Sequence, residues 1–249
     1  MAGSTFASRS YRDTAVILRT QNLGEADRII TALTPHHGVV RAVAKGVRRT
    51  SSKFGATVEP FMVADAQFVH GRSLDIITQA TSRATYGSLI VADYDKYTAA
   101  STMVEAAERI SESDVDATRG QFALLYGALS ALARGVHAAD LVMNSYLLRA
   151  LSTAGWAMTW TVCVNCGSQG PHHGFHPGAG GPVCMDCRPP GTISMASDTT
   201  RLLHALQHGQ WEGMESARQD IRFEAGHIVS SYVDHHLERR LNSSRMSES

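Results

Sequence analysis

The chain has 249 residues, of which 43% are hydrophobic, and its 23 Lys and Arg residues balance its 23 Asp and Glu residues. This length and apolar content allow a sizeable buried core, divided between two or three units. The sequence has no apolar run near the roughly 20 residues of a membrane-spanning helix, and no secretory signal at its start, so we expect a cytoplasmic protein without a membrane partner.

The net charge of zero conceals an excess of positive charge in the first third of the chain. Residues 1–80 contain ten Lys and Arg against six Asp and Glu. The excess of positive charge is concentrated in a thirteen-residue segment without any acidic residue. Its five cations are Arg41, Lys45, Arg48, Arg49 and Lys53. Such a segment is typical of a surface that follows a polyanion, although basic runs are also common as ordinary solvated loops.

The first eighty residues contain short β-branched and apolar runs separated by turn signals. The predicted strands are residues 14–19, 28–33, 39–45, 58–69 and 74–78. About five strands at this spacing favour a small closed or partly open barrel, and the oligonucleotide-binding (OB) barrel is the favoured member of that class.

In the third predicted strand, Arg41 and Lys45 share one face and the alanines between them share the other. OB barrels combine a charged groove with aromatic rings that stack on bases. The rings near the basic segment are Phe54, Phe61 and Phe68. We expect Phe61 and Phe68 to be buried core residues, because both fall within strand patterns.

From about residue 85 the apolar residues recur at intervals of three and four, which predicts amphipathic helices. Helices are expected around residues 99–110, 122–132, 141–151 and 221–241. Gly135 is expected to end one helix, and Ser197 or Asp198 to cap a further helix that Gly209 ends.

All the cysteines fall in one C-x2-C-x17-C-x2-C array: Cys163, Cys166, Cys184 and Cys187. Two C-x2-C turns supply four thiolates at about 2.3 Å from one tetrahedral zinc ion, and four protein ligands leave no open position for catalysis. Disulfides are disfavoured because they would need an oxidising compartment. A redox C-x-x-C pair is disfavoured because such a pair is expected where a strand enters a helix, and neither pair has that setting. The histidines between the two pairs are interpreted as exposed loop residues: His172, His173 and His176.

The sequence contains no nucleophile elbow, phosphate-binding loop, dinucleotide fingerprint or metalloprotease motif, which argues against an enzyme. The basic segment and the cysteine array alone also permit two other functions. One is a zinc-ribbon regulator that binds nucleic acid, and the other is a protein adaptor, each without annealing activity.

Together these motifs resemble the bacterial RecO family of recombination mediator proteins, over nearly the whole chain. The resemblance rests on V-I-L-R-T at 16–20 with L-G-E-A-D-R-I-I at 23–30, on A-K-G-V-R-R at 44–49 with S-K-F-G at 52–55, on the cysteine array with G-G-P-V-C at 180–184, and on H-L-E-R at 236–239. It implies an α+β multidomain fold. We expect an OB barrel over residues 1–82, a helical domain over 83–160, an inserted zinc module over 161–190, and C-terminal helices over 191–249 that complete the helical domain.

The resemblance also implies a function in DNA repair without catalysis. Members of the family are expected to bind single- and double-stranded DNA, to anneal complementary strands, to contact the C-terminal tail of single-strand-binding protein, and to cooperate with RecR in loading RecA. By position, the DNA role falls on Lys45, Arg48, Arg49 and Lys53, with Arg41 added from its charge, and the four cysteines hold one structural zinc ion. We expect a cytoplasmic, nucleoid-associated protein.

Overall fold

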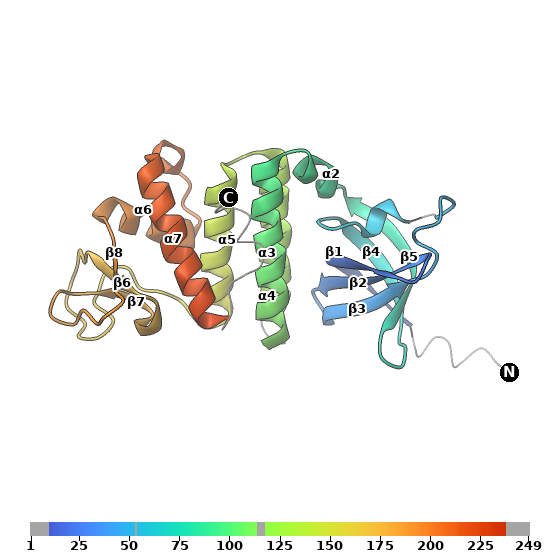
Figure 1. Cartoon of the computed structure of the whole chain (residues 1–249), viewed down its shortest axis with the longest axis horizontal. Helices are drawn as coiled ribbons and strands as arrows, with labels where there is room; N and C mark the ends of the chain where they lie inside the picture. Colours follow the sequence, from blue (N-terminus) through green and yellow to red (C-terminus); the bar gives the residue numbers. More distant parts are fainter. Residues whose placement is uncertain (1–9, 53, 114–117, 238–249) are drawn as a thin grey trace.

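A computed structural model of the chain describes residues 10–52, 54–113 and 118–237. The molecule is elongated, with a β-barrel at one end, helices in the middle and a small cysteine-containing unit at the other end (Figure 1). Lys53, one of the five cations predicted to contact DNA, lies outside the described residues. Within these ranges, none of the helices has both the length and the hydropathy of a membrane span.

The barrel confirms the predicted all-β N-terminal unit. It closes in the order β1-β2-β3-β5-β4, and every neighbouring pair is antiparallel except β3 and β5. The strands are β1 (Ser10–Leu23), β2 (Asp27–Thr34), β3 (Gly38–Ala44), β4 (Val63–Val69) and β5 (Asp75–Ala84). In β3 the buried Val40, Ala42 and Ala44 alternate with the exposed Arg41, as the sequence predicts.

The predicted strand over residues 58–69 is wrong in its first half. A 3-10 turn, η1 (Ala56–Val58), precedes an irregular segment, and β4 begins only at Val63. Phe61 adopts a left-handed φ of 67°, which interrupts strand geometry. Its N–H donates to the Ile17 carbonyl at 2.9 Å, and its buried ring meets Tyr97 edge-on. Tertiary packing of Phe61 therefore overrides the local strand pattern.

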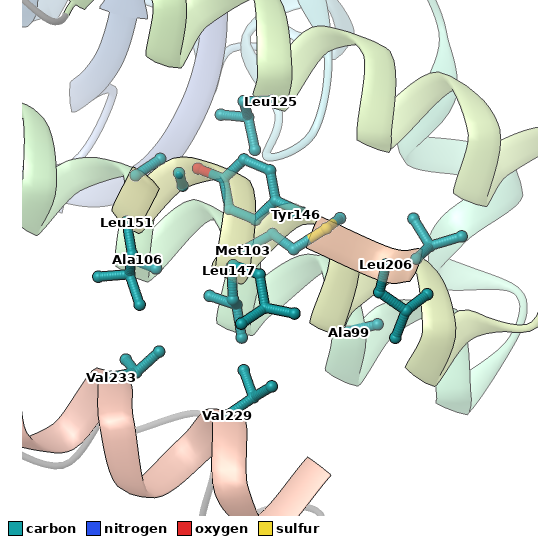
Figure 2. Close-up of a cluster of buried hydrophobic side chains, with 14 of the residues drawn as sticks. Ala99, Met103, Ala106, Leu125, Tyr146, Leu147, Leu151, Leu206, Val229 and Val233 are labelled. Atoms are coloured by element: carbon teal, nitrogen blue, oxygen red, sulfur yellow. The ribbon is translucent and has the colours of Figure 1, made fainter. Parts of the chain in front are cut away.

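In the part of the chain that the structure describes, six α-helices follow the barrel, with α5 between a pair on each side (Figure 1). They are α2 (Tyr86–Val91), α3 (Tyr94–Ser113), α4 (Thr118–Arg134), α5 (Ala139–Thr153), α6 (Ser197–His208) and α7 (Gln219–His236), and a 3-10 turn, η3 (Met214–Ser216), precedes α7. Figure 2 shows Met103, Tyr146, Leu147 and Val229 from α3, α5 and α7 within one apolar cluster. The predicted helical period is thus the period of a shared core.

Glycine ends two of these helices where the sequence predicts it. Gly135 and Gly209 have φ of 62° and 67°, and each directly follows the last residue of α4 or α6. Glycine adopts this left-handed conformation without the steric cost of a Cβ atom, which is why it stops helices.

The predicted cap of α6 is wrong. Ala196 occupies the N-cap position, whereas Ser197 and Asp198 lie inside the first turn. The carboxylate of Glu224 on α7 accepts hydrogen bonds from the Ala196 N–H at 3.1 Å and from the Thr199 hydroxyl. A neighbouring helix therefore supplies a hydrogen-bond acceptor at the start of α6.

The barrel and the helices share apolar packing. One hydrophobic cluster joins residues of β1, β2 and β4 to α3, α4 and α5, and its barrel members include Val16, Leu18, Leu33 and Val63. A second cluster fills the barrel interior and includes Ile17, Ile30, Phe68 and Ile77. Alternate residues of β1 thus face the barrel interior and the helices. Arg19 adds a contact, with its Nη2 atom donating to Glu108 of α3 at 2.7 Å.

Candidate nucleic-acid interface and metal centre

The basic segment leaves β3 through a turn that is fastened to the turn between β1 and β2. Gly46, at φ 65°, donates its N–H to the Asp27 carboxylate at 2.7 Å. The Arg48 N–H donates to the Ala26 carbonyl at 2.9 Å, and the Val47 side chain is buried between these contacts. The cations that flank Val47 are therefore presented on a fixed backbone.

Four of the five predicted DNA-binding residues are described, and all four are exposed: Arg41, Lys45, Arg48 and Arg49. Arg48 donates to the Gly24 carbonyl at 3.1 Å, which orients its guanidinium without neutralising it. Among the residues that the structure describes, no carboxylate forms an ion pair with these four side chains. By contrast, Arg28 on β2 is paired with Glu59 at 2.5 Å. The barrel thus has cations available to an external polyanion.

The phenylalanines near this face do not form a stacking surface. Phe61 and Phe68 are 3% and 1% exposed, which confirms that both belong to the core, and Phe54 is half-buried against the barrel interior. Elsewhere on the barrel, the partly buried Tyr11 and the exposed His37 and His70 come from three separate segments. Sequence spacing gave no signal for them, because only the closure of the barrel brings them together.

The structure brings the four cysteines together at the opposite end of the molecule from the barrel (Figure 1). Their Sγ atoms all lie within 4.8 Å of one another, and none is in a disulfide. The Sγ atoms of Cys166 and Cys184, one from each C-x2-C pair, are 3.8 Å apart. Such a cluster of thiols is compatible with a metal site.

Backbone hydrogen bonds shape the first cysteine pair into a knuckle. The Cys163 N–H donates to the Ser168 carbonyl at 2.9 Å, and the Gly167 N–H returns to the Cys163 carbonyl at 2.8 Å. Gly167 has φ 73°, which favours glycine. The Cys184 N–H points to the Cys163 sulfur at 3.4 Å, so the second pair is hydrogen-bonded to the first.

These contacts separate the thiol pKa values. Backbone N–H donors, first that of Cys184 and then that of Cys166, lower the pKa of Cys163 to about 6. Hydrogen bonding to the Cys184 and Cys166 side chains raises the pKa of Cys187 to about 12. Thiolates this close repel one another, so all four ionise together only when a cation lies among them.

The unit around the cysteines has more structure than a glycine-rich loop suggests. It contains β6 (Gly174–His176), the 3-10 turn η2 (Pro177–Ala179), β7 (Gly181–Val183) and β8 (Ile193–Ser194), with sheet order β7-β6-β8. Phe175 is fully buried, with its ring centroid 6.0 Å from Trp160 and 5.9 Å from Tyr232 of α7. The unit is therefore anchored on the helices by an aromatic contact.

The interpretation of the three intervening histidines as exposed is correct only for His173. His172 is buried, and its Nε2 atom lies 2.9 Å from the Ser168 carbonyl oxygen. His176 is half-buried, and its Nδ1 atom accepts a hydrogen bond from the Ala179 N–H at 3.0 Å. Both side chains stabilise turns, and neither belongs to the thiol cluster.

Two family models match the chain, one on each side of residue 90. Residues 8–86 match the description "Recombination protein O N terminal", and residues 91–245 match "Recombination protein O C terminal". The chain belongs to the RecO family. Curated RecO relatives cover nearly the same length. It is 46% identical over 238 residues to the DNA repair protein RecO of Thermobifida fusca, and 48% identical over 244 residues to the DNA repair protein RecO of Streptomyces coelicolor.

These matches cover 96% of the chain and 98% of each relative. The family resemblance inferred from the short motifs is therefore confirmed at full length. RecO proteins are described as recombination and DNA repair proteins, and membership of this family supports the prediction that the chain is not an enzyme.

Proposed function

We propose that the chain is a recombination mediator in DNA repair. In this proposal it binds single- and double-stranded DNA, anneals complementary strands, and helps to load RecA onto strands coated with single-strand-binding protein. The supporting observation is the set of exposed and unneutralised cations on the barrel, in a family described by recombination and repair.

The proposed mechanism is electrostatic. In this mechanism DNA phosphates bind Arg41, Lys45, Arg48 and Arg49, and Lys53, which lies outside the described residues, is the fifth cation of the same segment. Neutralising the phosphates of two strands reduces their mutual repulsion, and base pairing between the strands then supplies sequence recognition. No covalent bond is broken in this process.

We propose that the four cysteines hold one structural zinc ion. A tetrahedral zinc site with sulfur at about 2.3 Å places neighbouring sulfurs about 3.8 Å apart. The separation between Cys166 and Cys184 has this value. When bound, zinc would supply the positive charge that allows four adjacent thiolates to coexist. Because the cluster lies at the far end of the molecule from the barrel, we assign zinc a role in folding the β6–β8 unit (Figure 1).

The proposed protein partners are the C-terminal tail of single-strand-binding protein, RecR and, indirectly, RecA. Their contact residues are not assigned. The helical region does offer a groove between α3, α5 and α7, beside the exposed apolar side chains of Tyr94, Val136 and Phe223. This groove is also the observation that favours the alternative function, a protein adaptor without annealing activity.

The deciding experiment follows duplex formation between two complementary oligonucleotides, each precoated with the cognate single-strand-binding protein, by fluorescence and without nucleotide. The zinc-loaded full chain is expected to accelerate annealing. Folded, zinc-loaded protein that gives no acceleration would refute the mediator function. Retardation of single strands without annealing would then favour the zinc-ribbon regulator, whereas no retardation at low salt would favour the adaptor.

A further inference from the structure

Three rings from separate segments meet where Tyr11 packs against the apolar interior of the barrel. Tyr11 on β1 stacks on His37, which precedes β3, with ring centroids 4.1 Å apart and planes at 30°. His70, which follows β4, lies 4.7 Å from Tyr11. Beneath them Tyr11 is stacked 5.0 Å from the buried Phe68, its cross-strand neighbour. We call Tyr11, His37 and His70 the ring stack.

Two carboxylates fix the orientation of each ring in the stack. Asp13 accepts from His37 Nδ1 at 2.8 Å and from His36 Nδ1 at 3.0 Å through its two oxygens. Asp75 accepts from the Tyr11 hydroxyl at 2.5 Å and lies 3.3 Å from His70 Nδ1. A ring held in this way loses little conformational freedom when a ligand stacks on it.

Two of these groups, Asp13 and Tyr11, have shifted pKa values. Burial would raise the pKa of Asp13, but hydrogen bonds from His36, His37 and the backbone outweigh that effect and lower it below its ordinary value. Burial and the hydrogen bond to Asp75 raise the pKa of Tyr11 far above its ordinary value. The phenol therefore stays neutral, and both carboxylates are occupied with their ring partners.

The stack differs from ordinary core packing because its outer members remain in contact with solvent. The side chains of His37 and His70 are 36% and 58% exposed. Two exposed cations lie close by in the fold. Arg72 occupies the turn between His70 and Asp75, and Arg41 precedes Ala42, which is paired with Asp75 across β3 and β5. A polar groove of about 560 Å³ begins at His36 and continues over β1, β4 and β5.

Aromatic rings beside cations are the combination by which OB barrels hold single strands: the cations follow the phosphates and the rings stack on the bases. From this geometry we propose that the ring stack is a binding site for an unpaired nucleobase of single-stranded nucleic acid. The inference rests on the proposed DNA binding and deepens it, because it assigns a base contact to rings other than the phenylalanines near the basic segment. The basic segment supplies the phosphate contact, and β3 joins the two sites, since His37 precedes its first residue and Lys45 follows its last.

The test compares two oligomers of equal length and charge, an oligothymidylate and its abasic sugar–phosphate counterpart, binding to the zinc-loaded full chain at fixed salt. Base–aromatic stacking predicts that wild-type protein prefers the base-containing oligomer by about tenfold or more. His37→Ala/His70→Ala is expected to lose most of this preference while its salt dependence stays unchanged. His70→Phe, which restores an aromatic surface at an exposed position, is expected to retain the preference.

The controls separate failure of this site from failure of DNA binding. Arg48→Ala/Arg49→Ala is expected to weaken binding of both oligomers equally. If the double histidine variant is poorly folded, His70→Ala alone serves in its place, since that side chain is largely exposed. Equal binding of the two oligomers by wild type, or full preference in a folded alanine variant, would overturn the base site and leave the phosphate contacts intact. Folded wild type that binds neither oligomer would overturn both proposals.

Discussion

Replacing Arg48 and Arg49 by alanine gives a quantitative test of the proposed DNA contact. Each phosphate neutralised on a single strand contributes about 0.7 to the slope of log affinity against log salt. Five contacts, the four exposed cations and Lys53, give a slope of about 3.5, so affinity falls about 130-fold between 50 and 200 mM salt. The double variant keeps three contacts, a slope of about 2.1 and a fall of about 18-fold.

The assay is fluorescence anisotropy with a labelled oligothymidylate at several salt concentrations. Arg201→Ala/Arg218→Ala is the matched control, because it removes the same charge from exposed, ion-paired side chains near α6 and α7. The control should have the wild-type slope. If Arg48→Ala/Arg49→Ala leaves both affinity and slope unchanged, the basic segment does not contact phosphate and the proposed interface is wrong.

Three further predictions concern folding and the metal. Cys163→Ser should lose the zinc ion and destabilise the β6–β8 unit, as measured by zinc content and by hydrogen exchange over residues 160–190. Glu224→Ala removes the acceptor for the Ala196 N–H and the buried Thr199 hydroxyl. This change should lower the free energy of unfolding by about 1 to 3 kcal/mol in denaturant titrations. Burial, with a smaller effect of His235, lowers the pKa of His236 below its ordinary 6.5. The unfolded state therefore binds more protons as pH falls through 6.5, so the thermal midpoint should drop between pH 7.5 and 5.5, and less so in His236→Phe.

Each of these predictions has its own control. Met185→Ser changes an exposed neighbour of Cys184 and should keep one zinc ion per chain, whereas stoichiometric zinc in Cys163→Ser would refute the ligand assignment. Leu89→Ala, at a side chain 55% exposed, sets the scale for a substitution without buried partners. A Glu224→Ala effect no larger than that scale contradicts the capping role. An identical pH dependence in His236→Phe and wild type excludes His236 as the titrating group.

Patterns within one segment predicted structure well wherever neighbouring residues decide the conformation. The alternation of residues around Arg41 and Ala42 correctly predicted the two faces of β3, and Gly135 and Gly209 correctly predicted the ends of two helices. The cysteine spacing predicted which sulfurs meet, because a C-x2-C turn brings its own two thiols together and four ligands complete one site.

The errors arose where a distant residue decides the outcome. Phe61 leaves strand geometry because its ring packs against Tyr97 of α3. Ser197 does not cap α6, and the acceptor at the start of that helix is Glu224, which lies 25 residues from its partner Thr199 in the chain. The ring stack was not predicted for the same reason: its three members come from three segments that only the folded barrel brings into contact. No periodicity along the chain reports such contacts.

The apolar cluster that joins the barrel to the helices has a practical consequence for work with fragments. Val16, Leu18 and Leu33 are almost fully buried where the barrel meets the helices. A fragment that ends near Thr85 would expose these side chains to water as one hydrophobic patch, and such a patch favours self-association. Measurements on an isolated N-terminal piece would therefore report the behaviour of that uncovered patch as well as that of the proposed DNA-binding face.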